Sequence, residues 1–307
     1  MRANDIEIAT RRTLWRLLGD FPRERFEIAE RQALELRLPG ARAERLDLIK
    51  RNGEHVRAIL TGPEGEWRGF PALLYCHAHG GKYEIGASEL IAGRPALLTP
   101  PYAQALADRG FVVLCIDMPC FGERTHNTES ELAKRHLWRG QTLFGVMLTE
   151  LIAAIDLLAS MKEVDGERIG AMGISMGATH AFWLGALDTR IKAIAHLCCF
   201  ADLAMLVSGG GHDRHGIYMT VPNLLDHIST GRIAGLAAPR PQLACIGLRD
   251  PLTPEDAART AIEDARASYR RAGAESALEI LIDAETGHQE TPAMRKAVLD
   301  FLTRNLG

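Results

Sequence analysis

The sequence has 307 residues, 47% of them hydrophobic, and a formal net charge of −3, a combination that excludes intrinsic disorder. A fold of this size hides roughly three quarters of the surface that its unfolded chain would expose. The 36 basic and 39 acidic residues leave no basic excess for the phosphates of a nucleic acid. Length and composition therefore predict a globular protein of one or two domains with no nucleic-acid partner.

The N-terminal residues and the cysteines predict a cytoplasmic protein. Charged residues interrupt Met1–Asp20, where a secretory signal would need a continuous apolar stretch. No apolar run reaches the roughly 20 residues that cross a bilayer, so we expect no membrane partner. The six cysteines follow neither a zinc-ribbon spacing nor a CxxC spacing, and three of them lie in apolar runs. We interpret the cysteines as small buried side chains in a reducing compartment.

The first 45 residues are rich in charge and predict a helical extension. Arg11–Leu18 and Glu24–Leu36 have the apolar periodicity of amphipathic helices. The next two segments, Glu44–Lys50 and His55–Leu60, alternate around Asn52-Gly53, which predicts a β-hairpin. We therefore expect a helical extension over residues 1–45, with charged helices that are a candidate homodimer interface, and the main domain over residues 46–307.

Beyond Phe70-Pro71, short apolar runs alternate with helical segments. The predicted strands are Ala72–Cys76, Val112–Asp117, Arg168–Gly173, Ile191–Cys198, Gln242–Gly247 and Leu278–Ile282. The predicted helices are Tyr102–Arg109, Gln141–Met161, Met176–Leu187, Glu255–Ala272 and Pro292–Leu306. This alternation predicts an α/β fold with a mostly parallel sheet of about eight strands, covered by helices on both faces. Residues 118–139 and 200–241 lack periodicity, which is typical of functional loops or lids.

A nucleophile motif follows the predicted strand Arg168–Gly173. Gly173-Ile174-Ser175-Met176-Gly177 matches G-x-S-x-G, and a predicted helix begins directly after Ser175. A strand, a tight turn and a helix are the setting in which this motif carries a nucleophilic serine. The turn must hold the serine in a strained conformation, while the two glycines allow strand and helix to approach each other. We predict that Ser175 is a nucleophile.

A nucleophilic serine needs a base and an acid that orients the base. Asp250 follows the predicted strand Gln242–Gly247, and His288 follows the predicted strand Leu278–Ile282. Both lie at carboxyl ends of strands, where an open α/β sheet places its chemistry. The order Ser175, Asp250, His288 is also the order expected for this topology. Asp202, which follows the preceding strand, is the rival acid.

The loop after Ala72–Cys76 is predicted to form an oxyanion hole together with the backbone N–H of Met176. It reads His77-Ala78-His79-Gly80-Gly81, a variant of the Gly-rich motif that supplies a backbone N–H to the tetrahedral intermediate. His79 is the preferred donor, Gly80 and Gly81 are alternatives, and His77 is expected to be structural. His77 and His79 also spell H-x-H, and His212 and His215 lie in a Gly-rich segment, but the sequence continues unlike a metal site. We therefore predict no metal and no cofactor.

These motifs, in this order, resemble the α/β-hydrolase superfamily, and specifically its dienelactone-hydrolase-like and acetyl-xylan-esterase-like branch. The resemblance runs from about Leu46 to the C-terminus through HAHGG, DMPCFGER, GISMG, GLRD and TGH. It implies a serine hydrolase with Ser175 as nucleophile, His288 as general acid and base, and Asp250 as its partner. It also implies His79 and Met176 as oxyanion donors. The chain departs from dienelactone hydrolases proper, whose nucleophile is cysteine.

The expected activity is hydrolysis of a small-molecule carboxylic ester through an acyl-enzyme. A peptidase or amidase would use the same triad, and a non-catalytic binding protein on this fold is a further alternative, as is a metal-dependent hydrolase. The candidates to line the substrate pocket are aromatic and apolar residues, one after the His77–Gly81 loop and four in the two irregular segments: Tyr83, Phe121, Trp138, Tyr218 and Met219.

Overall fold

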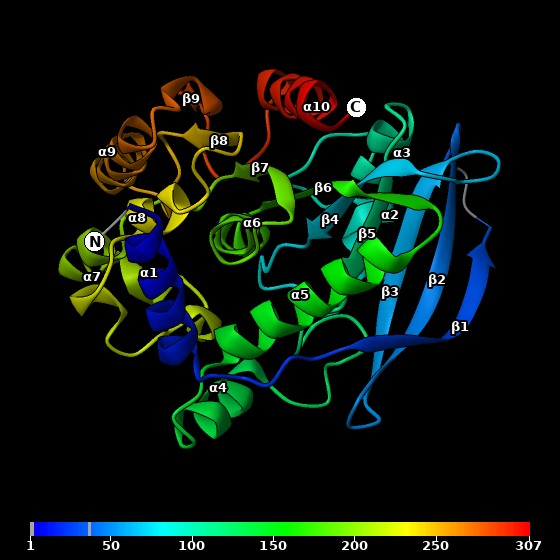
Figure 1. Ribbon diagram of the computed structural model, residues 1–307, viewed down its shortest axis with the longest axis horizontal. Coiled ribbons are helices and arrows are strands. Elements are labelled where there is room, and N and C mark those ends of the chain that lie inside the picture. The colour runs from blue at the N-terminus through cyan, green and yellow to red at the C-terminus, as the bar shows by residue number, and fades with distance from the viewer. Residues whose placement is uncertain (1–2, 36–37) are drawn as a thin grey trace.

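The computed structural model describes residues 3–35 and 38–307, which form one nine-stranded sheet with helices on both faces (Figure 1). The strands are β1 (Phe26–Leu34), β2 (Ala41–Lys50), β3 (His55–Pro63), β4 (Phe70–Cys76), β5 (Val112–Ile116), β6 (Val164–Ile174), β7 (Ile191–Leu197), β8 (Gln242–Gly247) and β9 (Leu278–Asp283). Their order in the sheet is β1-β2-β3-β5-β4-β6-β7-β8-β9. Strands β4 to β9 are parallel to one another, whereas β1, β2 and β3 join the sheet as an antiparallel edge.

The helices divide between two hydrophobic layers. They are α1 (Ala3–Leu18), α2 (Glu89–Ala92), α3 (Tyr102–Ala107), α4 (Glu129–Leu137), α5 (Leu143–Ser160), α6 (Met176–Leu187), α7 (Leu203–Ser208), α8 (Thr230–Gly235), α9 (Glu255–Arg271) and α10 (Pro292–Leu306). Apolar side chains of α1, α5, α6, α8 and α9 form the core on one face of the sheet, and those of α2, α3 and α10 form the core on the other. This arrangement confirms the predicted α/β fold and its doubly covered parallel sheet.

Strand and helix predictions from Ala72 onward are confirmed, with shifts of a few residues at their ends. The predicted hairpin around Asn52-Gly53 is confirmed as β2 and β3. The sheet has nine strands where about eight were expected, because the N-terminal region supplies an additional edge strand.

The predicted helix over Glu24–Leu36 is wrong. The described part of this segment forms strand β1, and Leu36 lies outside the described residues. Strand β1 pairs antiparallel with β2, and this pairing overrides the helix-favouring composition of the segment. Within 3–35 and 38–45, the described part of this region, only α1 is an α-helix, and β2 crosses the predicted boundary at residue 45, so the described residues do not form a helical extension.

Helix α5 is long and apolar enough to cross a membrane by length and composition alone, with a mean hydropathy of 1.9. In the structure 67% of it is buried inside the molecule, and it packs against β6 and α6. A helix in the core of a protein can meet the same criteria of length and hydropathy.

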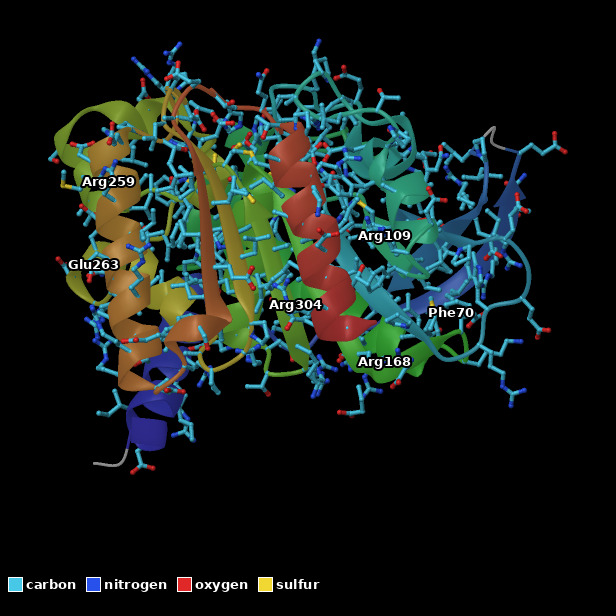
Figure 2. All side chains as sticks on the ribbon, turned by 90° about the horizontal axis from the view of Figure 1, so that it is seen from above. Phe70, Arg109, Arg168, Arg259, Glu263 and Arg304 are labelled. Carbon is cyan, nitrogen blue, oxygen red and sulfur yellow. The ribbon has the colours of Figure 1, made fainter. Side chains whose placement is uncertain are left out.

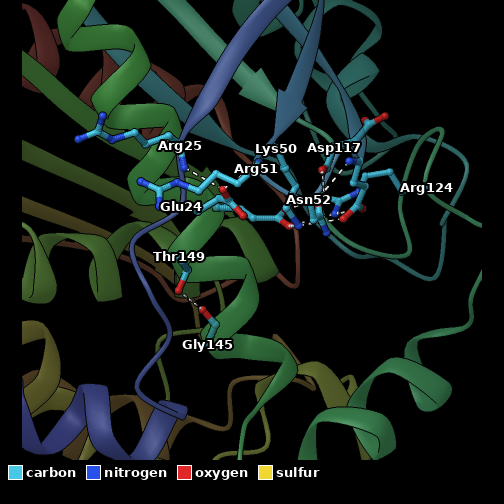
Figure 3. A network of polar contacts seen from close by, with 11 residues as sticks. Glu24, Arg25, Lys50, Arg51, Asn52, Asp117, Arg124, Gly145 and Thr149 are labelled. Atoms are coloured by element: carbon cyan, nitrogen blue, oxygen red, sulfur yellow. Dashed lines mark hydrogen bonds and ion pairs between the residues drawn. The ribbon is translucent and has the colours of Figure 1, made fainter.

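A buried ion network anchors the β2–β3 hairpin to α5 (Figure 3). The ammonium of Lys50 lies 2.5 Å from Oε1 of Glu150, and Nη1 of Arg124 lies 2.6 Å from the other carboxylate oxygen. Arg124 also donates to the carbonyl oxygen of Asp117, 2.9 Å away, at the end of β5. These contacts hold the segment after β5 against the body of the domain.

Charged side chains cover the outer faces of the last two helices (Figure 2). Arg304 of α10 pairs with Glu279 of β9, and Arg109 lies 3.3 Å from Asp300 of α10. Helix α10 is therefore held from both sides, by the edge strand of the sheet and by the turn after α3.

The two segments without periodicity, residues 118–139 and 200–241, contain helices. The first contains α4, and the second contains α7, α8 and several single 3₁₀ turns. Their helices are short, which explains why no periodicity is visible in the sequence.

Candidate active site

Ser175 lies at the sharp turn between β6 and α6. Its backbone angles are φ 59° and ψ −121°, a strained conformation for a residue with a side chain. Its N–H donates to the carbonyl oxygen of Leu197, 2.9 Å away, at the end of the neighbouring strand β7. The residue is only 8% exposed. The sheet and the helix together impose the conformation that the G-x-S-x-G motif predicts.

The two glycines of the motif are required by close backbone approach. A Cβ atom on Gly177 would lie 1.8 Å from the carbonyl oxygen of Cys76, and one on Gly173 would lie 2.5 Å from the same atom. Real Cβ atoms do not approach other atoms this closely, so side chains at these positions would push the turn away from β4. The glycines therefore place Ser175 directly beside the end of β4.

The structure brings Asp250 and His288 together, although 37 residues separate them in the chain. Nδ1 of His288 lies 2.7 Å from Oδ2 of Asp250. The carboxylate is fully buried and the imidazole is partly exposed, so one ring nitrogen is held by the acid while the ring reaches the surface. This is the geometry that orients a histidine as a base.

Neighbouring groups hold the Asp250 carboxylate in place. The N–H of Leu252 donates to Oδ1 at 2.8 Å, and the hydroxyl of Thr253 donates to Oδ2 at 3.1 Å. Oγ1 of Thr253 in turn accepts the N–H of Cys199, 3.1 Å away, on the loop after β7. These bonds connect the Asp250 turn to the loop that faces Ser175.

The rival acid, Asp202, has a different role. Its side chain accepts the N–H of Met205 at 3.1 Å and caps the N-terminus of α7. Its own N–H donates to the carbonyl oxygen of Ala257. The carboxylate that contacts His288 is therefore that of Asp250.

Ser175 and His288 are not hydrogen-bonded to each other among the described residues. The hydroxyl of Ser175 lies 3.7 Å from Sγ of Cys199. The loop after β7 approaches both sides of the site, because Sγ of the next residue toward the strand, Cys198, lies within 4.8 Å of a His288 ring nitrogen and of an Asp250 oxygen. Catalytic hydrogen bonds are often long before substrate binds.

The loop predicted to form the oxyanion hole is fixed by buried side chains. Nε2 of His77 accepts the N–H of Met118 at 3.2 Å, and its Nδ1 lies 3.0 Å from the carbonyl oxygen of Ala78. Burial lowers the pKa of His77 to about 4, so the ring is neutral. The N–H of Ala78 donates to Glu89, and its carbonyl accepts from Arg94. The prediction that His77 is structural is confirmed.

Glu129 of α4 holds the side chain of His79. Nε2 of His79 lies 2.6 Å from Oε2 of Glu129, and Nδ1 of His79 accepts the N–H of Gly81 at 3.0 Å. The same carboxylate accepts the hydroxyl of Tyr83 at 2.8 Å and the N–H of Tyr218 at 2.8 Å. Despite burial, which would raise it, the pKa of Glu129 is lowered by these donors, His79 first. One carboxylate thus joins the predicted oxyanion loop to both irregular segments.

Four of the five candidate pocket residues lie near this site. Rings of Tyr83, Phe121 and Tyr218 surround His79, with ring centroids 5.0 to 5.9 Å from it. Met219 lines a hollow that also reaches Cys199. Trp138 instead lies at the end of α4 with 88% of its surface exposed.

The donor set near His288 does not suit a metal. Cys198, Asp250 and His288 place a sulfur, an oxygen and a nitrogen within 4.8 Å of one another. A metal ligand must be a thiolate, and burial raises the pKa of Cys198 well above its ordinary value. The aspartate and the histidine are already bonded to each other. Both ring nitrogens of His77 and of His79 also have partners within the protein.

Three residues at the site were not found by sequence reasoning: Glu129, Thr253 and Cys199. Glu129 contacts His79 across 50 residues of chain, and Cys199 contacts Ser175 across 24, whereas Thr253 lies only three residues from Asp250. The single available signal was that Glu129 lies in a segment without periodicity, which suggested a functional loop.

Comparisons with known proteins identify related sequences and structures. Residues 101–209 match the dienelactone hydrolase family. The chain is 37% identical over 294 residues to the "Putative hydrolase YtaP" of Bacillus subtilis (strain 168), covering 96% of this chain and 98% of that protein.

Solved structures share the fold at low sequence identity. A glucuronoyl esterase from Solibacter usitatus superposes with a TM-score of 0.69 and 14% identity, covering 98% of this chain and 92% of that one. Acetyl xylan esterase 1 from Thermoanaerobacterium sp. JW/SL YS485 has a TM-score of 0.61 and 15% identity, with 98% and 94% covered. The chain therefore belongs to the dienelactone hydrolase family and has the α/β-hydrolase fold.

Proposed function

We propose that the protein hydrolyses small-molecule carboxylic esters with Ser175, His288 and Asp250 as its catalytic triad. The observation that carries the proposal is the 2.7 Å contact between Asp250 and His288, beside a strained serine turn at the carboxyl ends of neighbouring strands. The esterases among the structural neighbours support the same class of reaction.

In the proposed reaction, the Ser175 hydroxyl turns from Cys199 toward His288 and attacks the ester carbonyl. His288 accepts the serine proton at Nε2 and passes it to the leaving alcohol, while Asp250 stabilises the imidazolium through Nδ1. The acyl group is then on Ser175, and a water activated by His288 releases it as the acid. No group outside the protein, the ester and water takes part.

The negative charge of each tetrahedral intermediate needs hydrogen-bond donors. The N–H of Met176 is the first of α6, and N–H groups at a helix N-terminus have no partner within the helix. The N–H of His79 is the proposed second donor, on a loop held by Glu129, Glu89 and Arg94. Each donor is worth on the order of 3 kcal/mol of transition-state stabilisation.

Replacement of the nucleophile is the direct test. We expect Ser175→Ala to abolish turnover of p-nitrophenyl esters and labelling by a fluorophosphonate, while thermal unfolding stays close to that of the wild type. Cys199→Ala is the matched control, because it removes the group beside the serine hydroxyl and leaves the triad intact. Near wild-type turnover by Ser175→Ala would refute the proposal.

The same triad can cleave an amide, so a peptidase or amidase is the alternative to an esterase. A comparison of one acyl group as its p-nitrophenyl ester and as its p-nitroanilide measures the preference. We expect the ester to be the better substrate, and a higher kcat/KM for the anilide would assign the protein to the peptidases or amidases.

A further inference from the structure

A cleft opens on the surface of the segment after β7. Its volume is about 390 Å³, which lies within the range of small-molecule sites. Val207, Ile217 and Leu225 line it, and these side chains are 49%, 38% and 44% exposed. Three large aliphatic side chains therefore gather around one hollow and stay in contact with water, and apolar side chains grouped in this way can mark a ligand-binding groove.

The cleft adjoins the surroundings of the proposed nucleophile through residues that it shares with a smaller hollow. A second hollow, of about 20 Å³, lies behind it, and Leu203, Met219 and Leu224 line both. Cys199 lines the inner hollow, and its Sγ lies 3.7 Å from the hydroxyl of Ser175. The inner hollow has room for about one water molecule. Met219, whose side chain is flexible, lines both the cleft and the inner hollow.

The cleft also adjoins the acid of the triad. His215 lines it, and Nε2 of His215 lies 3.0 Å from the carbonyl oxygen of Leu252. The N–H of Leu252 donates to Asp250. Leu252 therefore joins His215, on the wall of the cleft, to the carboxylate of Asp250.

We propose that this cleft is a substrate subsite that binds an apolar alkyl or aryl group of the ester. The inference rests on the proposed ester hydrolysis and adds the class of substrate. An apolar group that covers the three exposed aliphatic side chains removes them from water, and each methylene buried in this way raises kcat/KM by up to about fourfold. Esters with only short groups leave the cleft solvated and are poorer substrates.

A series of esters tests the proposal. We expect kcat/KM of the wild type to rise from the acetyl to the butyryl and octanoyl p-nitrophenyl esters, or from ethyl to butyl and octyl acetate. A rise in the first series places the acyl group in the cleft, and a rise in the second places the alcohol group there. Either result supports the subsite, and flat profiles in both series overturn it.

Charged substitutions in the cleft provide the second arm. We expect Ile217→Asp and Leu225→Asp, which come from different turns, each to lower kcat/KM for the preferred long-chain ester at least about tenfold, because the ligand would desolvate a carboxylate. The loss of kcat/KM should be smaller for the acetyl ester, because its acyl group is too short to fill the cleft. Ile28→Asp is the matched control, since Ile28 is 36% exposed on the edge strand β1.

The outcomes separate the subsite from the reaction. If both variants lower turnover of short and long esters equally, the cleft does not bind substrate and the inference fails. If the wild type hydrolyses no ester and Ser175 is not labelled by a fluorophosphonate, the proposed function itself fails. Hydrolysis of the acetyl ester with no chain-length preference overturns the subsite alone.

Discussion

At the scale of single residues, the choice between two aspartates depends on which of them contacts His288. Asp250 lies 2.7 Å from the imidazole, whereas Asp202 caps α7. Both follow parallel strands and both are almost fully buried, so neither position nor burial distinguishes them. The two aspartates differ in the partner that each carboxylate contacts: His288 for Asp250, and the N-terminus of α7 for Asp202. The same substitution is therefore expected to have different effects at the two positions.

We expect Asp250→Asn to lower kcat on the order of 10³- to 10⁴-fold, because an amide favours the wrong tautomer of the imidazole. Asp202→Asn should keep activity within a few-fold, since asparagine is an equally good N-cap. Steady-state kinetics with a p-nitrophenyl ester measures both. Equal losses in the two variants would contradict the assignment of Asp250.

Glu129 is a second residue whose effect can be predicted. Because it holds His79 and Tyr218 together, we expect Glu129→Gln to lower kcat about ten- to hundredfold with a smaller change in KM, as a displaced oxyanion donor would. Glutamine has only one acceptor oxygen, so it cannot accept at the same time from His79 and from Tyr218, which contact different oxygens of the carboxylate. A drop in the unfolding temperature without a change in kcat would show that the contact is only structural.

Glu131 provides the matched control for Glu129. It lies on the same helix, in a capping box with Thr128. Glutamine also serves at this position of a capping box, so Glu131→Gln should leave kcat unchanged.

At the scale of elements, the sheet edge shows where local sequence misleads. Strand β1 contains Glu, Ala, Arg, Gln and Leu, residues that favour helices, and it alternates little because most of its side chains are exposed. Its conformation comes from pairing with β2, a partner that no local pattern reveals. By contrast, β5 and β8 are buried along their whole length, and their apolar runs identify them at once.

The ion network between the hairpin and α5 should contribute strongly to stability. We expect Arg124→Met to lower the free energy of unfolding by about 3–5 kcal/mol, because Glu150 would be left buried with one cation fewer. Arg45→Met breaks the exposed pair with Glu123 and should cost less than about 1 kcal/mol. Urea unfolding compares the two variants, and equal costs would refute the role of the network.

At the scale of the whole molecule, buried histidines link stability to pH. Burial lowers the pKa of His77 to about 4 and the pKa values of His180 and His196 to about 3. Among the described residues, no hydrogen-bond partner is found for either ring nitrogen of His180 or of His196. The unfolded chain therefore binds more protons than the native protein below about pH 6.5.

The sign follows from this difference. The contribution of these histidines to stability is complete above about pH 6.5 and is lost as the pH falls toward their native pKa values. Each histidine steepens the loss by up to about 1.4 kcal/mol per pH unit. Urea unfolding at several pH values between 7 and 4.5 measures the slope.

His196 offers a variant for this test because it packs between Phe182 and Phe200. His196→Phe should lower by one the number of protons that the chain takes up when it unfolds, and so make the loss of stability with falling pH less steep. The same change at the exposed His126 is the control. An unchanged slope in His196→Phe would contradict this explanation.

The cytoplasmic location and the homodimer remain predictions at this scale, and light scattering tests the latter.

The sequence by itself determined the fold class, the serine turn and the chain order of the proposed nucleophile, acid and base. These follow from local patterns: buried strands are continuous apolar runs, and the turn needs glycines at fixed spacing. Only the tertiary structure decided that β1 is a strand, that Asp250 contacts His288, that Glu129 holds the loop of His79, and that an aliphatic cleft adjoins the small hollow lined by Cys199. Those contacts join residues far apart in the chain, and no local pattern encodes which distant side chains the sheet brings together.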